Sequence, residues 1–152
     1  MIASLLLAAL VTASSPAQAS GDLVYTYRAN SEVAPLKGYD GRPYWQVLAE
    51  CAGAHGALAN RYESQGLGPA TQLAKTKGVN FLNTANGRIR ADRGVTAAEA
   101  LALSSPHVDD GRAAGAVLLN RPTASGYSHE QLLDVMCAQV DERHARAART
   151  RR

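Results

Sequence analysis

The chain has 152 residues, a formal net charge of +3 and 5% aromatic residues, and alanine is frequent throughout. Such a small positive charge is not typical of a protein whose main partner is a polyanion. The length suits one domain with a single core. A core made chiefly of Leu, Val and Ala favours closely packed helices over a β-sandwich, so we expect an all-α fold.

Residues 1–19 are predicted to be a cleavable signal peptide. An apolar run extends from Ile2 to Val11, and Ala17 and Ala19 form the A-x-A pattern of a cleavage site before Ser20. The run is about half the ~20 residues that a transmembrane helix needs, and we expect no transmembrane segment in the mature chain. The sequence therefore predicts an exported protein, periplasmic or extracellular. Because no Lys or Arg precedes the run, a buried N-terminal helix is the alternative.

Residues 20–42 are expected to form an extended N-terminal arm. Gly, Pro, Asn and Ser surround one alternating run from Leu23 to Tyr27, and a turn signal follows at Gly38 to Gly41. Because no partner strand is recognisable elsewhere, we expect this run to lie on the core rather than in a sheet.

The helical domain, residues 43–152, is expected to begin with a helix from Pro43 to about Gly66. Proline suits the first position of a helix, and a seam with spacings of three and four follows: Tyr44, Leu48, Cys51, His55, Leu58 and Tyr62. The middle of this helix, residues 51–57, consists almost entirely of small residues. Each glycine there costs about 1 kcal/mol relative to alanine, which indicates that another backbone packs very close.

Further helical stretches are predicted before residue 120. One extends from Pro69 toward Arg90. A capping-box pattern at Thr96 to Glu99 starts a short helix through Leu103, which we expect Ser104 to Pro106 to break. Another stretch then extends from His107 to Leu119.

The last predicted helix follows a second capping-box pattern, Ser128 to Gln131. Its apolar seam continues at helical spacing through five positions: Leu133, Cys137, Val140, His144 and Ala147. We therefore expect a small helical bundle of about four main helices, followed by a basic C-terminal tail.

Cys51 and Cys137 are the two cysteines of the chain, and export would place them where a disulfide persists. We predict that they are paired and that the bridge joins the first long helix to the last. Two free thiols or an intermolecular bridge are the alternatives.

No local motif nominates a catalytic set, so the catalytic residues are unknown. The histidines His55, His107, His129 and His144 could in principle meet Asp109, Asp110, Glu130 or Asp141 around a metal. Since only Asp141 and His144 share convincing helical spacing, we predict no metal site, and nothing indicates a cofactor.

Five arginines cluster near the C-terminus as a possible anion-binding set: Arg143, Arg146, Arg149, Arg151 and Arg152. On a helix the first three would lie near one face and could contact an anionic envelope component. The alternative is that they complement the negative end of the last helix and form a solvated tail. No aromatic residue interleaves with them, so we do not expect a nucleic-acid partner.

Together these features favour a non-enzymatic periplasmic or secreted binding or accessory protein whose partner is unknown. A small exported hydrolase that uses His55 or another histidine with a nearby acid is one alternative. An envelope protein that docks on anionic surfaces through its Arg-rich tail is the other.

Overall fold

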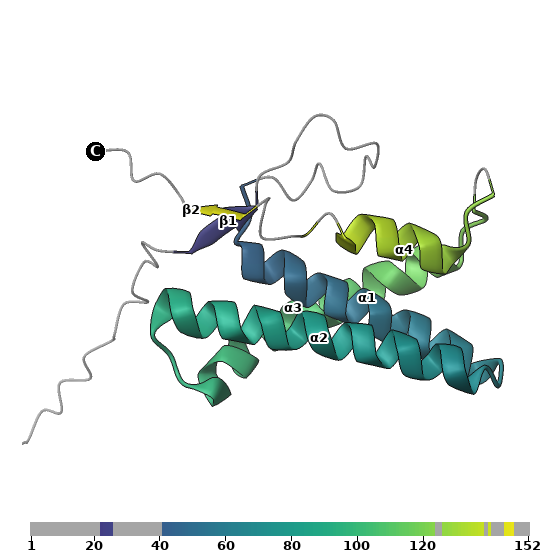
Figure 1. Ribbon diagram of the computed structural model, residues 1–152, viewed down its shortest axis with the longest axis horizontal. Helices are drawn as coiled ribbons and strands as arrows, with labels where there is room; N and C mark the ends of the chain where they lie inside the picture. The colour runs from purple at the N-terminus through teal and green to yellow at the C-terminus, as the bar shows by residue number, and fades with distance from the viewer. Residues whose placement is uncertain (1–21, 26–40, 124–125, 139, 141–144, 148–152) are drawn as a thin grey trace, which may run out of the picture.

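The computed structural model describes residues 22–25, 41–123, 126–138, 140 and 145–147 (Figure 1). The elements, in chain order, are β1 (Leu23–Tyr25), α1 (Tyr44–Ser64), α2 (Gly68–Arg93), α3 (Ala97–Leu119), α4 (His129–Ala138) and β2 (Ala145–Ala147). In the view of Figure 1, α1 lies between α2 below and α4 above, while α3 passes behind it. The predicted small all-α bundle is therefore confirmed.

Helix α1 is the centre of the core because its small side chains let two other helices approach it. Its larger residues, such as Val47, Leu48 and Leu58, are fully buried. A Cβ atom on Gly53 would lie 1.9 Å from the carbonyl oxygen of Val108 in α3. The predicted close approach of a second backbone to the middle of this helix is thus confirmed.

Helix α3 corrects one prediction, because it continues through Pro106 where we expected a break. The capping box at its start is present as predicted: Thr96 Oγ1 accepts from the Glu99 N–H and Glu99 Oε2 accepts from the Thr96 N–H. Buried Ser104 donates to Asn86 Oδ1 of α2 at 2.8 Å. The turn after the proline packs against α1, so tertiary contacts on both sides of Pro106 offset the lost helical hydrogen bond.

Helix α4 also corrects a prediction, since it ends at Ala138 rather than continuing to Ala147. The N–H of Val140 donates to the carbonyl of Cys137, and Val140 is buried against Tyr44, whose hydroxyl donates to its carbonyl at 3.2 Å. Because Val140 enters the core through this turn, the predicted seam is confirmed as far as Val140, although that residue is not helical. Residues 145–147 then form β2.

Strand β1 has the partner that we did not expect. It pairs antiparallel with β2, with Leu23 opposite Ala147 and Tyr25 opposite Ala145. Before the strand, buried Asp22 accepts hydrogen bonds from Trp45 Nε1 at 3.1 Å and from Arg93 Nε at 3.0 Å. The start of the described chain is therefore anchored on α1 and α2. Residues 20–21 and 26–40 of the predicted arm lie outside the described residues.

This anchor predicts a pH-dependent contribution to stability. Burial alone raises the pKa of Asp22, but the hydrogen bonds from Arg93 and Trp45 and the charge of Arg93 outweigh it, so the pKa lies below its usual 3.8. A lowered folded-state pKa means that the ionised carboxylate stabilises the fold above about pH 4, and that this contribution disappears as the pH falls through the folded value.

The variant Asp22→Asn keeps the size of the side chain and removes its charge. We expect it to be about 1–2 kcal/mol less stable than the wild type at neutral pH, because hydrogen bonds to an ionised partner are lost. Urea titrations across the acidic range should show the two curves converging below about pH 4. A difference that stays constant down to pH 3 would contradict this role of the carboxylate.

Candidate functional site

An apolar groove with a volume of about 370 Å³ lies where α1, α3 and α4 meet. Helix α1 contributes Glu50, Cys51 and Ala54. Helix α4 contributes Leu133, Met136 and Cys137. The opposite wall comes from α3 and the residues directly after it: Gly111, Ala114, Gly115, Val117, Leu118 and Arg121.

The floor of the groove is formed by close contact between α1 and α3. A Cβ atom on Gly111 would lie 2.0 Å from the carbonyl oxygen of Glu50, and one on Gly115 would lie 2.9 Å from the Cα of Ala54. No side chain larger than hydrogen fits there, so the two glycines, four residues apart, let α3 lie directly against the backbone of α1. The groove lies beside this contact, which bounds it on one side.

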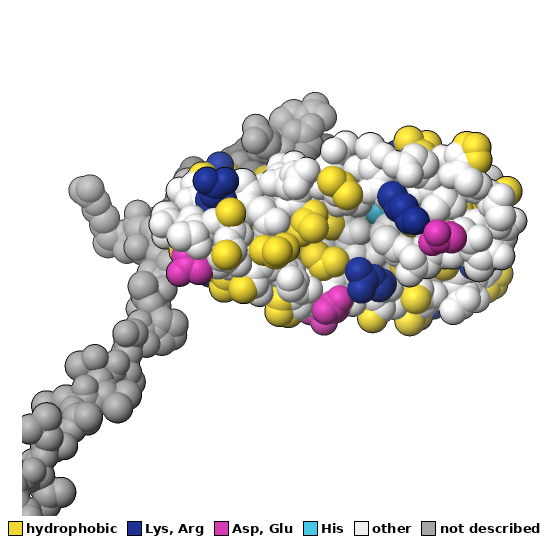
Figure 2. Space-filling view, turned by 90° about the horizontal axis from the view of Figure 1, so that it is seen from below, with side chains coloured by type: hydrophobic (Ala, Val, Ile, Leu, Met, Phe, Trp, Pro, Cys, Tyr) yellow, Lys and Arg dark blue, Asp and Glu magenta, His cyan; other side chains and the backbone are white. Residues whose placement is uncertain are grey.

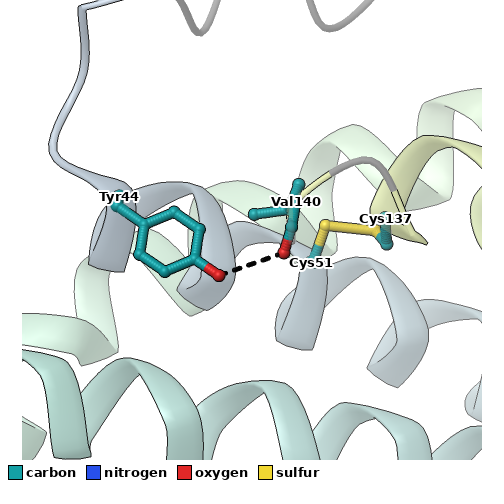
Figure 3. Close-up of a disulfide and its surroundings, with 4 residues drawn as sticks. All are labelled: Tyr44, Cys51, Cys137 and Val140. Carbon is teal, nitrogen blue, oxygen red and sulfur yellow. Dashed lines mark hydrogen bonds between the residues drawn. A yellow bond between two sulfur atoms is a disulfide. The ribbon is translucent and has the colours of Figure 1, made fainter. Parts of the chain in front are cut away.

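The wall that α4 forms is fixed by the predicted Cys51–Cys137 disulfide, which the structure confirms with a Cα–Cα distance of 5.9 Å. The bridge joins α1 to α4, and the Tyr44–Val140 hydrogen bond ties down the chain directly after α4 (Figure 3). The disulfide therefore stabilises the core and also sets the position of α4, which forms one side of the groove.

The lining is apolar and includes exposed surface. Val117 is 53% exposed. Met136 adds a flexible side chain that can adapt to irregular shapes. Apolar lining with a few polar groups at the margin is typical of sites for small molecules.

A second cleft, of about 360 Å³, lies on the other side of α1 against α2. Its charged residue is Lys77, whose Nζ lies 2.8 Å from both carboxylate oxygens of Asp134 and 3.7 Å from Glu130 Oε1. Glu130 in turn accepts from the Tyr62 hydroxyl, and burial together with this contact raises the pKa of Tyr62 to about 12. These groups form ion pairs and hydrogen bonds with one another and attach α4 to α1 and α2. Lys77 is therefore already engaged in holding the helices together.

His55, the histidine considered for hydrolysis, is 1% exposed. Its ring stacks on Phe81 of α2 at 5.5 Å, and its Nδ1 has no hydrogen-bond partner among the described residues. Burial lowers its pKa, so the ring is neutral at pH 7, although Asp134 and Glu130 partly oppose the shift. A neutral ring packed between two helices offers no approach to a substrate.

The other candidate metal ligands lie apart. His107 packs edge-on against Trp45, with Asp110 Oδ2 3.8 Å from its Nδ1, while the Nε2 of His129 hydrogen-bonds to the carbonyl of Arg121. Asp141 and His144 fall outside the described residues. Among the residues that the structure describes, no three His, Cys, Asp or Glu side chains gather as metal ligands would.

Of the five arginines proposed as an anion-binding set, Arg146 lies in β2, opposite Val24, rather than on the predicted helix. Arg143, Arg149, Arg151 and Arg152 lie outside the described residues. On the face of the molecule seen from the side of α2, basic and acidic side chains are interspersed and do not separate by sign (Figure 2). The described part of this face therefore presents no basic patch.

Sequence reasoning missed the groove. Gly111 and Gly115, spaced by four within a helical stretch, are the signal that could have identified it, because such a pair marks a face where two backbones can touch. The residues of α4 that complete the site are too distant in sequence to be assigned to it by any local pattern.

Comparison with known proteins identifies no relative: no family model, no curated protein and no solved structure matches this chain. Of the helices in the described ranges, none combines the length and the apolar character needed to cross a membrane.

Proposed function

We propose that this chain is an exported, non-enzymatic binding protein, periplasmic or secreted, whose groove between α1, α3 and α4 holds the hydrocarbon chain of a small amphiphile. The observation that carries the proposal is a groove of about 370 Å³ with apolar lining and only Glu50 and Arg121 as charged members. Burial of each methylene group there would contribute about 0.8 kcal/mol, so a short hydrocarbon chain is enough for useful affinity.

The size of the groove supports a small ligand over a macromolecule. Ligand pockets typically have volumes of roughly 300–1,000 Å³, and this groove falls within that range. A stable protein partner would cover about 20–30 residues on each side. Twelve residues line the groove, which suits one chain of a small molecule better than a docked helix.

Export is supported by the apolar run and the cleavage pattern of residues 1–19, and by a buried disulfide, a bond typical of oxidising compartments. The protein for testing should therefore be recovered from the periplasm or the medium, where we expect its mass to correspond to a chain that begins at Ser20. A chain that retains Met1 would contradict export and leave the groove to be tested separately.

Ligand binding can be tested with N-phenyl-1-naphthylamine, an uncharged dye whose fluorescence rises in apolar surroundings. We expect Ala114→Trp to weaken dye binding by about tenfold or more, because the indole would fill the groove from an exposed helical position without disturbing the core. The matched control is Ala116→Trp, since Ala116 is also exposed on α3 but does not line the groove. Equal dye binding by the two variants would mean that the dye does not occupy the groove, and the proposal would fail.

A further inference from the structure

The two charged residues of the groove lie at different levels along the axis of α3. Glu50 lies beside Gly111, where the two backbones touch, and Arg121 follows ten positions later. At a rise of 1.5 Å per residue, α3 extends about 12 Å from Gly111 to its end at Leu119, and Arg121 lies two residues beyond that end. The charges therefore mark opposite ends of an elongated apolar space.

These two charges differ in how they are compensated. The carboxylate of Glu50 accepts a hydrogen bond from Nη1 of Arg42 at 3.2 Å and another from its Nη2. The side chain of Glu50 is only 12% exposed. The side chain of Arg121 is exposed and forms no ion pair or hydrogen bond with the residues that the structure describes. A ligand in the groove thus meets a neutralised acid at one end and an available guanidinium at the other.

The backbone of Arg121 is held in place although its side chain is not engaged. Its carbonyl accepts from the His129 ring at 2.9 Å, and its N–H donates to the carbonyl of Leu118. The backbone of Arg121 is therefore fixed just after the end of α3, which limits the positions that its guanidinium can reach. Its planar, forked donors match a carboxylate or a sulfate with two parallel hydrogen bonds.

We infer that the ligand of the groove is a free single-chain anionic amphiphile, with its hydrocarbon chain between α3 and α4 and its head group on Arg121. This inference rests on the proposed function and adds the sign and the position of the head group. A cationic head at the same end would be repelled by Arg121, and at the other end it would have to compete with Arg42 for Glu50.

The inference can be tested with three ligands that share a ten-carbon chain: decanoate, 1-decanol and decylammonium, each displacing the uncharged dye below its aggregation concentration. For the wild type we expect decanoate to bind about fivefold more tightly than decanol, as for a partly exposed charge pair, and decylammonium to bind most weakly. Arg121→Gln should remove the difference between decanoate and decanol, and Arg121→Glu should reverse the order in favour of decylammonium.

The length of the chain provides a second readout. Within the alkanoates, each added methylene should strengthen binding by about fourfold until the groove is full, after which affinity should level off. Arg121→Gln should shift the whole series to weaker binding without changing this slope. A change in slope would mean that Arg121 affects the hydrocarbon site itself, and would overturn its assignment to the head group.

The outcomes separate the two proposals. If all three ten-carbon ligands displace the dye equally and Arg121→Gln changes nothing, the head-group inference is wrong while the hydrocarbon site stands. If none displaces the dye, and Ala114→Trp has no effect on it, the proposed function itself fails. Sedimentation with phosphatidylglycerol vesicles that requires Arg121, without displacement by decanoate, would identify a membrane surface instead of a free amphiphile and would overturn the inference.

Discussion

Replacement of both Cys51 and Cys137 by alanine will lower the free energy of unfolding by about 5 kcal/mol. The bridge closes a loop across a sequence separation of 86, and a loop of that size restricts the unfolded chain by about 4–5 kcal/mol in the loop-entropy model. The two residues are also buried, so the loss of their packing acts in the same direction.

The loss will be concentrated in α4. This helix has ten residues, too few for a helix to persist alone in water, and Leu133 and Cys137 are its buried members. Its other attachments are polar and partly exposed, namely the pairs Tyr62–Glu130 and Lys77–Asp134. Without the bridge we expect α4 to exchange its amide protons much faster than α1, and the groove to lose its wall.

Urea denaturation and hydrogen exchange measure these two effects. Reduced wild-type protein lacks only the covalent bond, whereas the double alanine variant also lacks the two buried sulfur atoms, so the difference between them measures the loss of packing. If the variant keeps α4 as protected as the oxidised wild type does, the bridge does not hold this helix in place.

The parts of the fold that could be predicted are those that local chemistry decides. Helix α1 was expected from Pro43 to about Gly66 and extends from Tyr44 to Ser64, because a proline start and a regular seam define it. Helix α2 followed its predicted range to within a few residues at each end. With two cysteines in the chain, a single intramolecular pairing was available, and the structure contains it.

The parts that could not be predicted depend on partners far away in the sequence. Helix α3 continues through Pro106 because Ser104 bonds to Asn86 and because Gly111 fits against Glu50. Residues 145–147 form β2 because β1 offers them backbone partners more than 100 positions earlier, with Leu23 opposite Ala147. Local sequence patterns contain no information on these contacts. The groove could not be predicted for the same reason, because residues from three helices form it.

Replacement of Gly53 by alanine provides the most direct test of the helix crossing on which the groove rests. Helix propensity alone predicts that this change stabilises α1 by about 1 kcal/mol. The structure predicts the opposite, since the new Cβ would lie 1.9 Å from the carbonyl oxygen of Val108 and 2.6 Å from the backbone nitrogen of Arg112. Because backbone atoms cannot rotate away, α1 and α3 must separate, and we expect a net loss of about 3 kcal/mol.

Gly87→Ala is the matched control for this substitution. Gly87 also lies inside a helix, and a Cβ there would meet nothing within 4 Å. We expect it to stabilise the protein by about 0.5–1 kcal/mol, so the two substitutions should shift the urea midpoint in opposite directions. A stabilising Gly53→Ala would show that α1 and α3 do not touch as described.

The combination of Gly53→Ala with Gly111→Ala tests whether the crossing behaves as one contact. Both substitutions push the same two helices apart, Gly111 through the backbone of Glu50 and Gly53 through that of Val108. Once one has separated the helices, the second meets less resistance, so the double variant should lose clearly less stability than the sum of the single losses. Its groove would have a displaced floor, and binding of the uncharged dye should weaken even in the fraction of molecules that remains folded.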